Sequence, residues 1–172
     1  TKRNTGSEER ATEAVQIASQ RGLNENYGRE LLELHTLGVD NFYKQKDVIA
    51  VAKCLTGWTT DSKREGTRKY VFNPDMHIDG NKHVLGKLMR EDKDGGPGQG
   101  MALLEMLGKH KGTADFIAMK MVRFLVADVP PEKLVAEVAK TYRKTDGDMK
   151  AMLQTIVESD EFWNPSNVRS KF

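Results

Sequence analysis

Apolar residues recur at spacings of three and four along most of this chain, and this periodicity limits what it can fold into. Tyr27, Leu31, Leu34 and Leu37 share one face of a predicted helix, and Gly38 follows where a left-handed C-cap belongs. The same spacing predicts helices over residues 44–56, 99–109, 113–125, 131–142 and 146–156, and a thinner one within 7–18. We therefore expect a mainly α protein.

The helical pattern breaks near residues 58–74. Tyr70, Val71 and Phe72 form a brief strand-like run closed by Asn73-Pro74, which predicts a small hairpin or extended excursion. Residues 76–86 and the glycine-rich residues 90–100 are predicted to be loops. The predicted architecture is an irregular or orthogonal bundle of about seven helices, with one short β excursion near residues 58–74.

Length and charge set the broad limits. At 172 residues the chain is long enough for one domain with a real core. We expect residues 1–22 to form a polar N-terminal arm or peripheral helix, and residues 23–172 a single helical domain. Because 27 Lys and Arg residues nearly balance 25 Asp and Glu residues, the charge gives no case for nucleic acid. No apolar run approaches the ~20 residues of a transmembrane helix.

The first strong helix also carries the densest group of ionisable residues. Glu30 and Glu33 are three apart, and Arg29 and Glu33 four apart, so each pair should share a helical face. One interpretation is a carboxylate pair for metal binding or acid–base catalysis. The alternative is a structural Arg–Glu network in which the carboxylate of Glu30 or Glu25 pairs with a buried cation. His35 lies two residues beyond Glu33 and points away from it, which argues against a helical ligand pair.

A second candidate lies in the predicted loop after residue 76. His77 and Asp79 can bind a divalent ion or act as a base with its orienting carboxylate. Alternatively, His77 and Lys82 tie the loop down by hydrogen bonds. The catalytic candidates are therefore Glu30, Glu33 and His77, and the metal candidates are these three with Asp79. A divalent metal is the one cofactor that these residues suggest.

Two further features have both a functional and a structural interpretation. Asn24, Asn26 and Tyr27 open the helix, where backbone N–H groups favour anions, but Asn24 is also a good N-cap. Trp58 after Gly57 suits a sugar-stacking platform, or an aromatic residue that closes the helix–strand junction. The candidate binding residues are Asn24, Glu25, Asn26, Tyr27, Arg29 and Lys82. Cys54 lies on an apolar pattern and is expected to be a small core residue.

The segment NENYGRELLELHTLGVD resembles the bacterial family known as domain of unknown function 1800. The similarity continues through KQKDVIAVAKCLTGW, FNPDMHIDGNKHVLG, FIAMKMVRFLVADVPPEKLV, DMKAMLQTIVESDEFW and the final RSKF, and so covers roughly residues 23–172. The positions that match the motifs are Asn24, Glu25, Asn26, Tyr27, Arg29, Glu30, Glu33, Gly38, Asp47, Val48, Thr56, Gly57, Trp58, His77, Gly80, Lys82 and Gly86. The family has no established catalytic residue. The resemblance therefore identifies motif positions in this chain but assigns no function to them.

The resemblance carries several expectations. It implies that this chain is the C-terminal portion of a longer protein, that the protein is exported to the periplasm or cell envelope, and that a sulfatase-like protein of neighbouring genes is a candidate partner. The chain departs from the family at two places. His77-Ile78-Asp79 stands where His-Asp is usual, which displaces the carboxylate by one residue, and Gly28 stands where alanine is common. Glycine inside a helix costs up to about 1 kcal/mol.

Two functions of different classes remain open at this point. The first is a non-enzymatic binding or scaffolding module, in which the polar groups of residues 24–38 are paired and buried. The second is a hydrolase-like or metal-dependent enzyme domain. It requires Glu30, Glu33, His77 and Asp79 to converge around an open cleft. No complete catalytic set follows from the spacing, which favours the first function.

Overall fold

The computed structural model describes residues 23–39, 41–61 and 69–167. The predicted arm or peripheral helix over residues 1–22 lies outside the described residues. The helical elements are α2 (Glu25–Glu30), the π-helix η1 (Leu31–Thr36), α3 (Gln45–Cys54), the 3-10 turn η2 (Pro74–Met76), α4 (Gly98–Gly108), α5 (Lys111–Leu125), α6 (Glu132–Lys144), α7 (Met149–Val157) and α8 (Asp160–Trp163). The strands are β1 (Trp58–Thr60), β2 (Tyr70–Phe72), β3 (Lys82–Val84) and β4 (Lys87–Met89). The protein is therefore mainly α-helical, as the sequence predicts.

The chain divides into two compact units. Among described residues, the first holds 23–29 and 44–103, and the second holds 30–39, 41–43 and 104–167. The prediction of one domain over residues 23–172 stays a prediction, because two compact units can belong to one domain.

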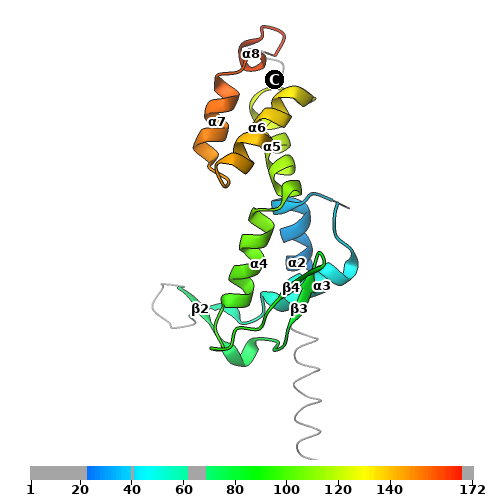
Figure 1. Ribbon diagram of the computed structural model, residues 1–172, viewed down its shortest axis with the longest axis vertical. Helices are drawn as coiled ribbons and strands as arrows, with labels where there is room; N and C mark the ends of the chain where they lie inside the picture. Colours follow the sequence, from blue (N-terminus) through cyan, green and yellow to red (C-terminus); the bar gives the residue numbers. More distant parts are fainter. Residues whose placement is uncertain (1–22, 40, 62–68, 168–172) are drawn as a thin grey trace, which may run out of the picture. The chain divides into compact units, whose positions relative to one another are not determined.

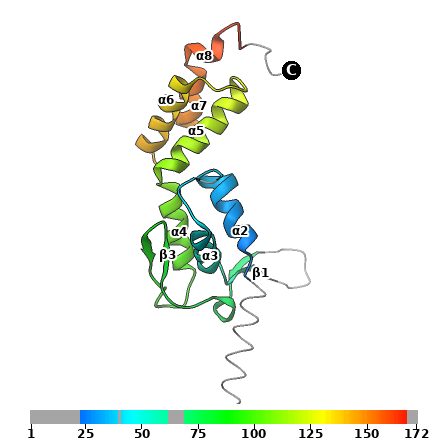
Figure 2. The same ribbon diagram turned by 90° about the vertical axis from the view of Figure 1, so that its right-hand side faces the viewer.

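In the first unit, α3 packs against β3 (Figure 2). The helix buries Val48, Val51, Ala52 and Cys54, and β3 buries Val84. The hairpin predicted near residues 58–74 is confirmed, since β1 pairs antiparallel with β2 and Trp58 lies opposite Phe72. The left-handed Gly57 (φ +85°) ends the turn after α3, as expected of a glycine at that place.

A second hairpin in the first unit corrects the predicted loop. β3 pairs antiparallel with β4, with Lys82 opposite Met89. Leu85 and Gly86 form the two-residue turn between them, and both have positive φ values, 53° and 76°. Such turns usually have asparagine or aspartate before the glycine. Because a leucine occupies this place, the local sequence does not predict the turn.

In the second unit, α6 packs on both α5 and α7 (Figure 1). The core between these helices consists of Ala118, Val122, Val126, Leu134, Val138, Ala139, Met152 and Ile156. Three large apolar residues of α5 and α7 are exposed: Phe124, Met149 and Leu153. α7 buries the neighbouring Met152 and Ile156, so its inward stripe is narrower than the apolar pattern indicates.

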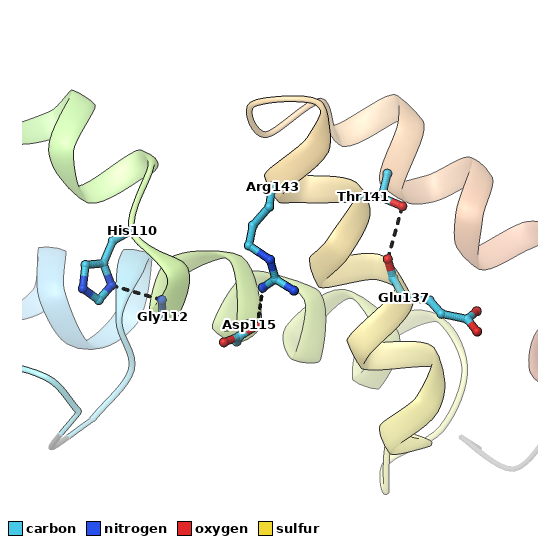
Figure 3. A network of polar contacts seen from close by, with 6 residues as sticks. All are labelled: His110, Gly112, Asp115, Glu137, Thr141 and Arg143. Carbon is cyan, nitrogen blue, oxygen red and sulfur yellow. Dashed lines mark hydrogen bonds and ion pairs between the residues drawn. The ribbon is translucent and has the colours of Figure 1, made fainter.

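Figure 3 shows a side-chain cap and an ion pair of the second unit. His110 Nδ1 accepts from Gly112 N at 3.0 Å and caps α5, and Arg143 of α6 pairs with Asp115 of α5 at 2.7 Å. Thr113 lies within α5, and its hydroxyl donates to Leu107 O. Asp148 caps α7, and its side chain accepts from Lys150 N and Ala151 N. Ser159 caps the short α8, and its hydroxyl oxygen accepts from Phe162 N.

Candidate functional site

The start of α2 confirms Asn24 as a capping residue. Asn24 Oδ1 accepts from Tyr27 N at 3.0 Å, which satisfies one of the free N–H groups at the helix start. The side chains around it, Glu25, Asn26 and Tyr27, are exposed, and Tyr27 retains 55% of its surface. These candidate binding residues are therefore accessible.

Gln45 of α3 joins two of the predicted binding residues. Its amide nitrogen donates to Glu25 Oε2 at 2.9 Å, and its amide oxygen accepts from the Arg29 guanidinium. Glu25 is exposed and Arg29 half-buried, so this paired network lies at the surface and not in the interior. Gln45 could not be predicted as part of this network, because the glutamine is 20 residues from Glu25 and on another helix.

The π-helix η1 changes the geometry of the other acidic candidates. Leu37 N bonds to Leu32 O at 2.7 Å, five residues back, and the Thr36 hydroxyl donates to Leu31 O. The wider π turn means that Glu30 and Glu33 do not stack at the α-helical spacing assumed from the sequence. Glu33 accepts from Tyr43 OH at 2.9 Å, whereas Glu30 is exposed.

The same π turn corrects the predicted apolar face. Leu32 and Leu37 are fully buried, but Leu34 and Tyr27 are about half exposed. Gly38, at φ +89°, ends the segment as the sequence predicts, and its N–H bonds to Leu32 O. No signal in the apolar spacing distinguishes a π turn from an α turn.

Gly28 has a structural role that its helix propensity conceals. It is buried against α3, and a Cβ there would lie 2.8 Å from Val48 O and 3.1 Å from Ala52 N. The α2 and α3 backbones thus approach more closely than an alanine would allow. In this chain the glycine thus accompanies a tight contact between the two helices.

His77 is fixed by the end of α3. Its Nδ1 lies 2.8 Å from Thr56 O, and because a carbonyl only accepts, Nδ1 carries the hydrogen. The Thr56 hydroxyl also accepts from Ile78 N at 2.9 Å. His77 Nε2 is buried and has no hydrogen-bond partner in the described part of the chain. Such an unpaired buried acceptor calls for an explanation.

Lys82 is buried on β3, and its Nζ donates to Ile78 O. Its ammonium group therefore ties down the loop that carries His77 and Asp79. Burial lowers the Lys82 pKa below its ordinary value, and the charges of Cys54, Glu91 and Asp79 oppose this shift. Cys54 is a buried core residue, as predicted, and burial raises the pKa of its thiol to about 11.

Trp58 packs edge-on to Tyr70 at 5.3 Å and lies over Gly100 of α4, where a Cβ would come within 2.8 Å of the indole. It is partly buried, and its Nε1 has no acceptor among the described residues. This is the packing expected of an aromatic residue that closes the junction between helix and strand.

A cleft of about 560 Å³ lies in the first unit, between the loop that carries His77 and the loop before α4. Its lining residues are Pro74, His77, Asp79, Asn81, Arg90, Glu91, Asp92, Lys93, Gly95 and Gly96. Two predicted site residues, His77 and Asp79, thus border the same cleft. The other lining residues could not be predicted, because the glycine-rich composition of the second loop indicates only a loop.

Three side chains fix the frame of this cleft. Asn81 Oδ1 accepts from Glu91 N at 2.9 Å and links its two loops. Asp92 Oδ2 accepts from Gly98 N at the start of α4. The buried Gln99 donates from one amide nitrogen to Gly80 O and Met89 O, both at 3.1 Å. The loop of predicted flexibility is thus held by specific bonds.

The four metal candidates divide between the units. Glu30 and Glu33 belong to the second unit, whereas His77 and Asp79 belong to the first. Within either unit, as far as it is described, no group of three or more His, Cys, Asp or Glu side chains is placed to hold a metal ion. His77 and Asp79 are the pair that one unit brings to a common cleft.

These features define a mainly helical domain with a polar surface at the start of α2 and a charged cleft between two loops. The family described as Protein of unknown function (DUF1800) matches residues 1–172, and the chain belongs to this family. No curated protein and no solved structure matches the chain. None of the described helices has the length and apolar character needed to cross a membrane.

Proposed function

We propose that this domain is a binding or scaffolding module of an exported bacterial protein, and that the start of α2 is its recognition surface. The observation that supports this proposal is the bridge from Gln45 to both Glu25 and Arg29 at the protein surface. The bridge restrains two long charged side chains before any partner arrives. Restrained side chains lose less conformational entropy on binding, which favours affinity.

Tyr27 adds an amphipathic anchor to the same surface. It is 55% exposed, and it follows Glu25 and Asn26 on the first turn of α2. Tyrosine and arginine are enriched among the residues that dominate protein–protein affinity, because each combines apolar contact area with hydrogen-bonding groups. A protein surface with its own polar groups is the partner that this chemistry suits.

The proposed partner is the sulfatase-like protein of neighbouring genes, and the proposed location is the periplasm or cell envelope. Both rest on the family resemblance. A fractionation of the native bacterium tests the location, with the protein expected in the periplasmic or envelope fraction. Recovery in the cytoplasmic fraction alone would contradict it.

The partner is tested with purified proteins. The chain is titrated with the sulfatase-like protein by calorimetry, as wild type, Tyr27→Ala and Arg29→Ala. Each variant should weaken binding by about tenfold or more. Tyr70→Ala is the matched control, because Tyr70 is similarly exposed, at 54%, but lies on β2. No saturable binding, or equal losses in all three variants, would disprove this surface.

One observation favours the alternative of a metal-dependent domain. Because His77 Nδ1 donates to a backbone carbonyl, Nε2 is the nitrogen left to accept, an arrangement typical of metal-bound histidine. Elemental analysis of protein purified without chelator tests it. Stoichiometric metal that is lost in His77→Ala but kept in His83→Ala would support the alternative, since His83 is an exposed histidine on β3.

A further inference from the structure

The cleft in the first unit has charged walls on a fixed frame. Asn81 joins its two loops, Asp92 accepts from Gly98 N, and Gln99 holds Gly80 O and Met89 O. The backbone at the cleft is therefore set by bonds from side chains around it. A site with a preformed frame loses less free energy to ordering when a ligand binds.

Both signs of charge border this cleft, and the carboxylates of Asp79 and Glu91 also lie near the buried Lys82, whose protonated form they stabilise. Arg90 and Lys93 contribute cations, and Asp79 and Glu91 contribute carboxylates. All four residues are exposed. Within the described ranges, no hydrogen bond or ion pair joins a cation of this set to one of its carboxylates. Asp92 differs, because its carboxylate accepts from backbone N–H groups.

We propose that this cleft binds a zwitterionic ligand of about dipeptide size. The ligand's carboxylate binds Arg90 and Lys93, and its ammonium group binds Asp79 and Glu91. Charge-assisted hydrogen bonds of this kind are stronger than neutral ones, and the arginine fork fits a carboxylate with two parallel bonds. A cleft of about 560 Å³ lies within the size range of small-molecule sites, with room for more than one amino acid.

Ligands with a single charge fit the cleft less well. A bare metal cation would meet the carboxylates but also the positive charges of Arg90 and Lys93. A simple anion would meet these cations but also the negative charges of Asp79 and Glu91. A ligand with separated charges of both signs satisfies all four groups. The inference concerns residues other than those of the α2 surface and does not rest on the proposed protein partner.

The test uses the full chain and three probes, measured by calorimetry at low ionic strength. L-alanyl-L-alanine carries both charges, its N-acetyl form lacks the ammonium group, and its C-terminal amide lacks the carboxylate. We expect saturable binding of the free dipeptide and at least about tenfold weaker binding of each blocked form. Equal binding of all three probes, or no binding of the free dipeptide at millimolar concentration, would overturn the proposal.

Matched variants place the binding in the cleft. Arg90→Ala and Asp79→Asn should each weaken dipeptide binding by about tenfold or more. The controls are Lys87→Ala and Asp75→Asn, which remove the same charges from exposed residues outside the cleft lining. Unchanged binding in the first two variants, or losses as large in the controls, would show that the cleft is not the site. If Zn²⁺ binds with higher affinity and displaces the dipeptide, the cleft is a metal site and the proposal of a zwitterionic ligand is wrong.

Discussion

Asp47 joins the start of α3 to the turn between β3 and β4. Its Oδ2 accepts from Lys44 N at 2.9 Å, and its Oδ1 accepts from Leu85 N at 2.8 Å. The residue is buried, with 4% of its surface exposed. One carboxylate thus caps a helix and stabilises a hairpin turn 38 residues away.

Replacement of Asp47 by alanine should therefore be costly. Two backbone N–H groups lose their acceptor, and we expect the free energy of unfolding to fall by about 2–4 kcal/mol. Urea denaturation measures the change. Asp75→Ala, at an exposed residue of η2, should change stability by less than about 0.5 kcal/mol. Similar small effects in both variants would show that the Asp47 bonds contribute little.

Gly28→Ala should destabilise the protein although alanine is the better helix former. The new methyl group would meet Val48 O at 2.8 Å, a backbone atom that cannot move aside alone. We expect a loss of about 1–3 kcal/mol from this overpacking. Gly108→Ala at the end of α4 is the control, because a Cβ there meets nothing within 4 Å. It should be neutral or stabilising by up to about 1 kcal/mol. A stable Gly28→Ala protein would mean that α2 and α3 can separate at little cost.

Glu30→Ala should leave stability nearly unchanged. The side chain is exposed, so we expect a shift in the free energy of unfolding of less than about 0.5 kcal/mol. Glu33→Ala should cost about 1 kcal/mol, because it removes the acceptor of Tyr43 OH. Thermal or urea unfolding of both variants distinguishes these expectations. A large loss of unfolding free energy in Glu30→Ala would support the interpretation that Glu30 belongs to a structural Arg–Glu network.

Cys54 should make stability fall at high pH. The folded state holds the thiol pKa at about 11, above the ordinary 9.0, so the thiolate is disfavoured by folding. The stabilising contribution is complete below pH 9 and is lost as the pH rises from about 9 towards 11. The Lys82 pKa is lowered, which acts in the opposite direction within this range.

Comparison with a variant isolates the thiol. Wild type should lose more stability than Cys54→Ala between pH 8 and 10.5, since the alanine variant lacks the titrating group. Folded wild type should also resist alkylation by iodoacetamide at pH 8. Equal pH dependence in both proteins would contradict a raised Cys54 pKa.

The sequence predicted those features that local patterns determine. Apolar spacing gave the helices of both units, and the glycines at 38 and 57 ended their segments as expected. Asn24 was identified as a cap for the same local reason. The hairpin of β1 and β2 followed from β-branched and aromatic residues bounded by Asn73-Pro74.

Features that depend on distant contacts were not predictable. The β3–β4 turn has Leu85 at positive φ, which Asp47 of another element supports. Gln45 links Glu25 and Arg29 from a separate helix, and Gln99 holds the cleft loop from α4. Asp47, Gln45 and Gln99 are each an ordinary polar side chain in its own segment. Only the fold gives each of them a partner.

The π turn of η1 has a consequence for how such chains are compared. A π turn holds one more residue than an α turn between bonded groups, here from Leu32 O to Leu37 N. A relative that lacks one residue between positions 31 and 36 can therefore keep both flanking turns in place as a regular α-helix. Alignments that forbid a gap inside this helix would shift one side of it by a residue. They would then pair buried positions such as Gly28 with exposed ones such as Tyr27.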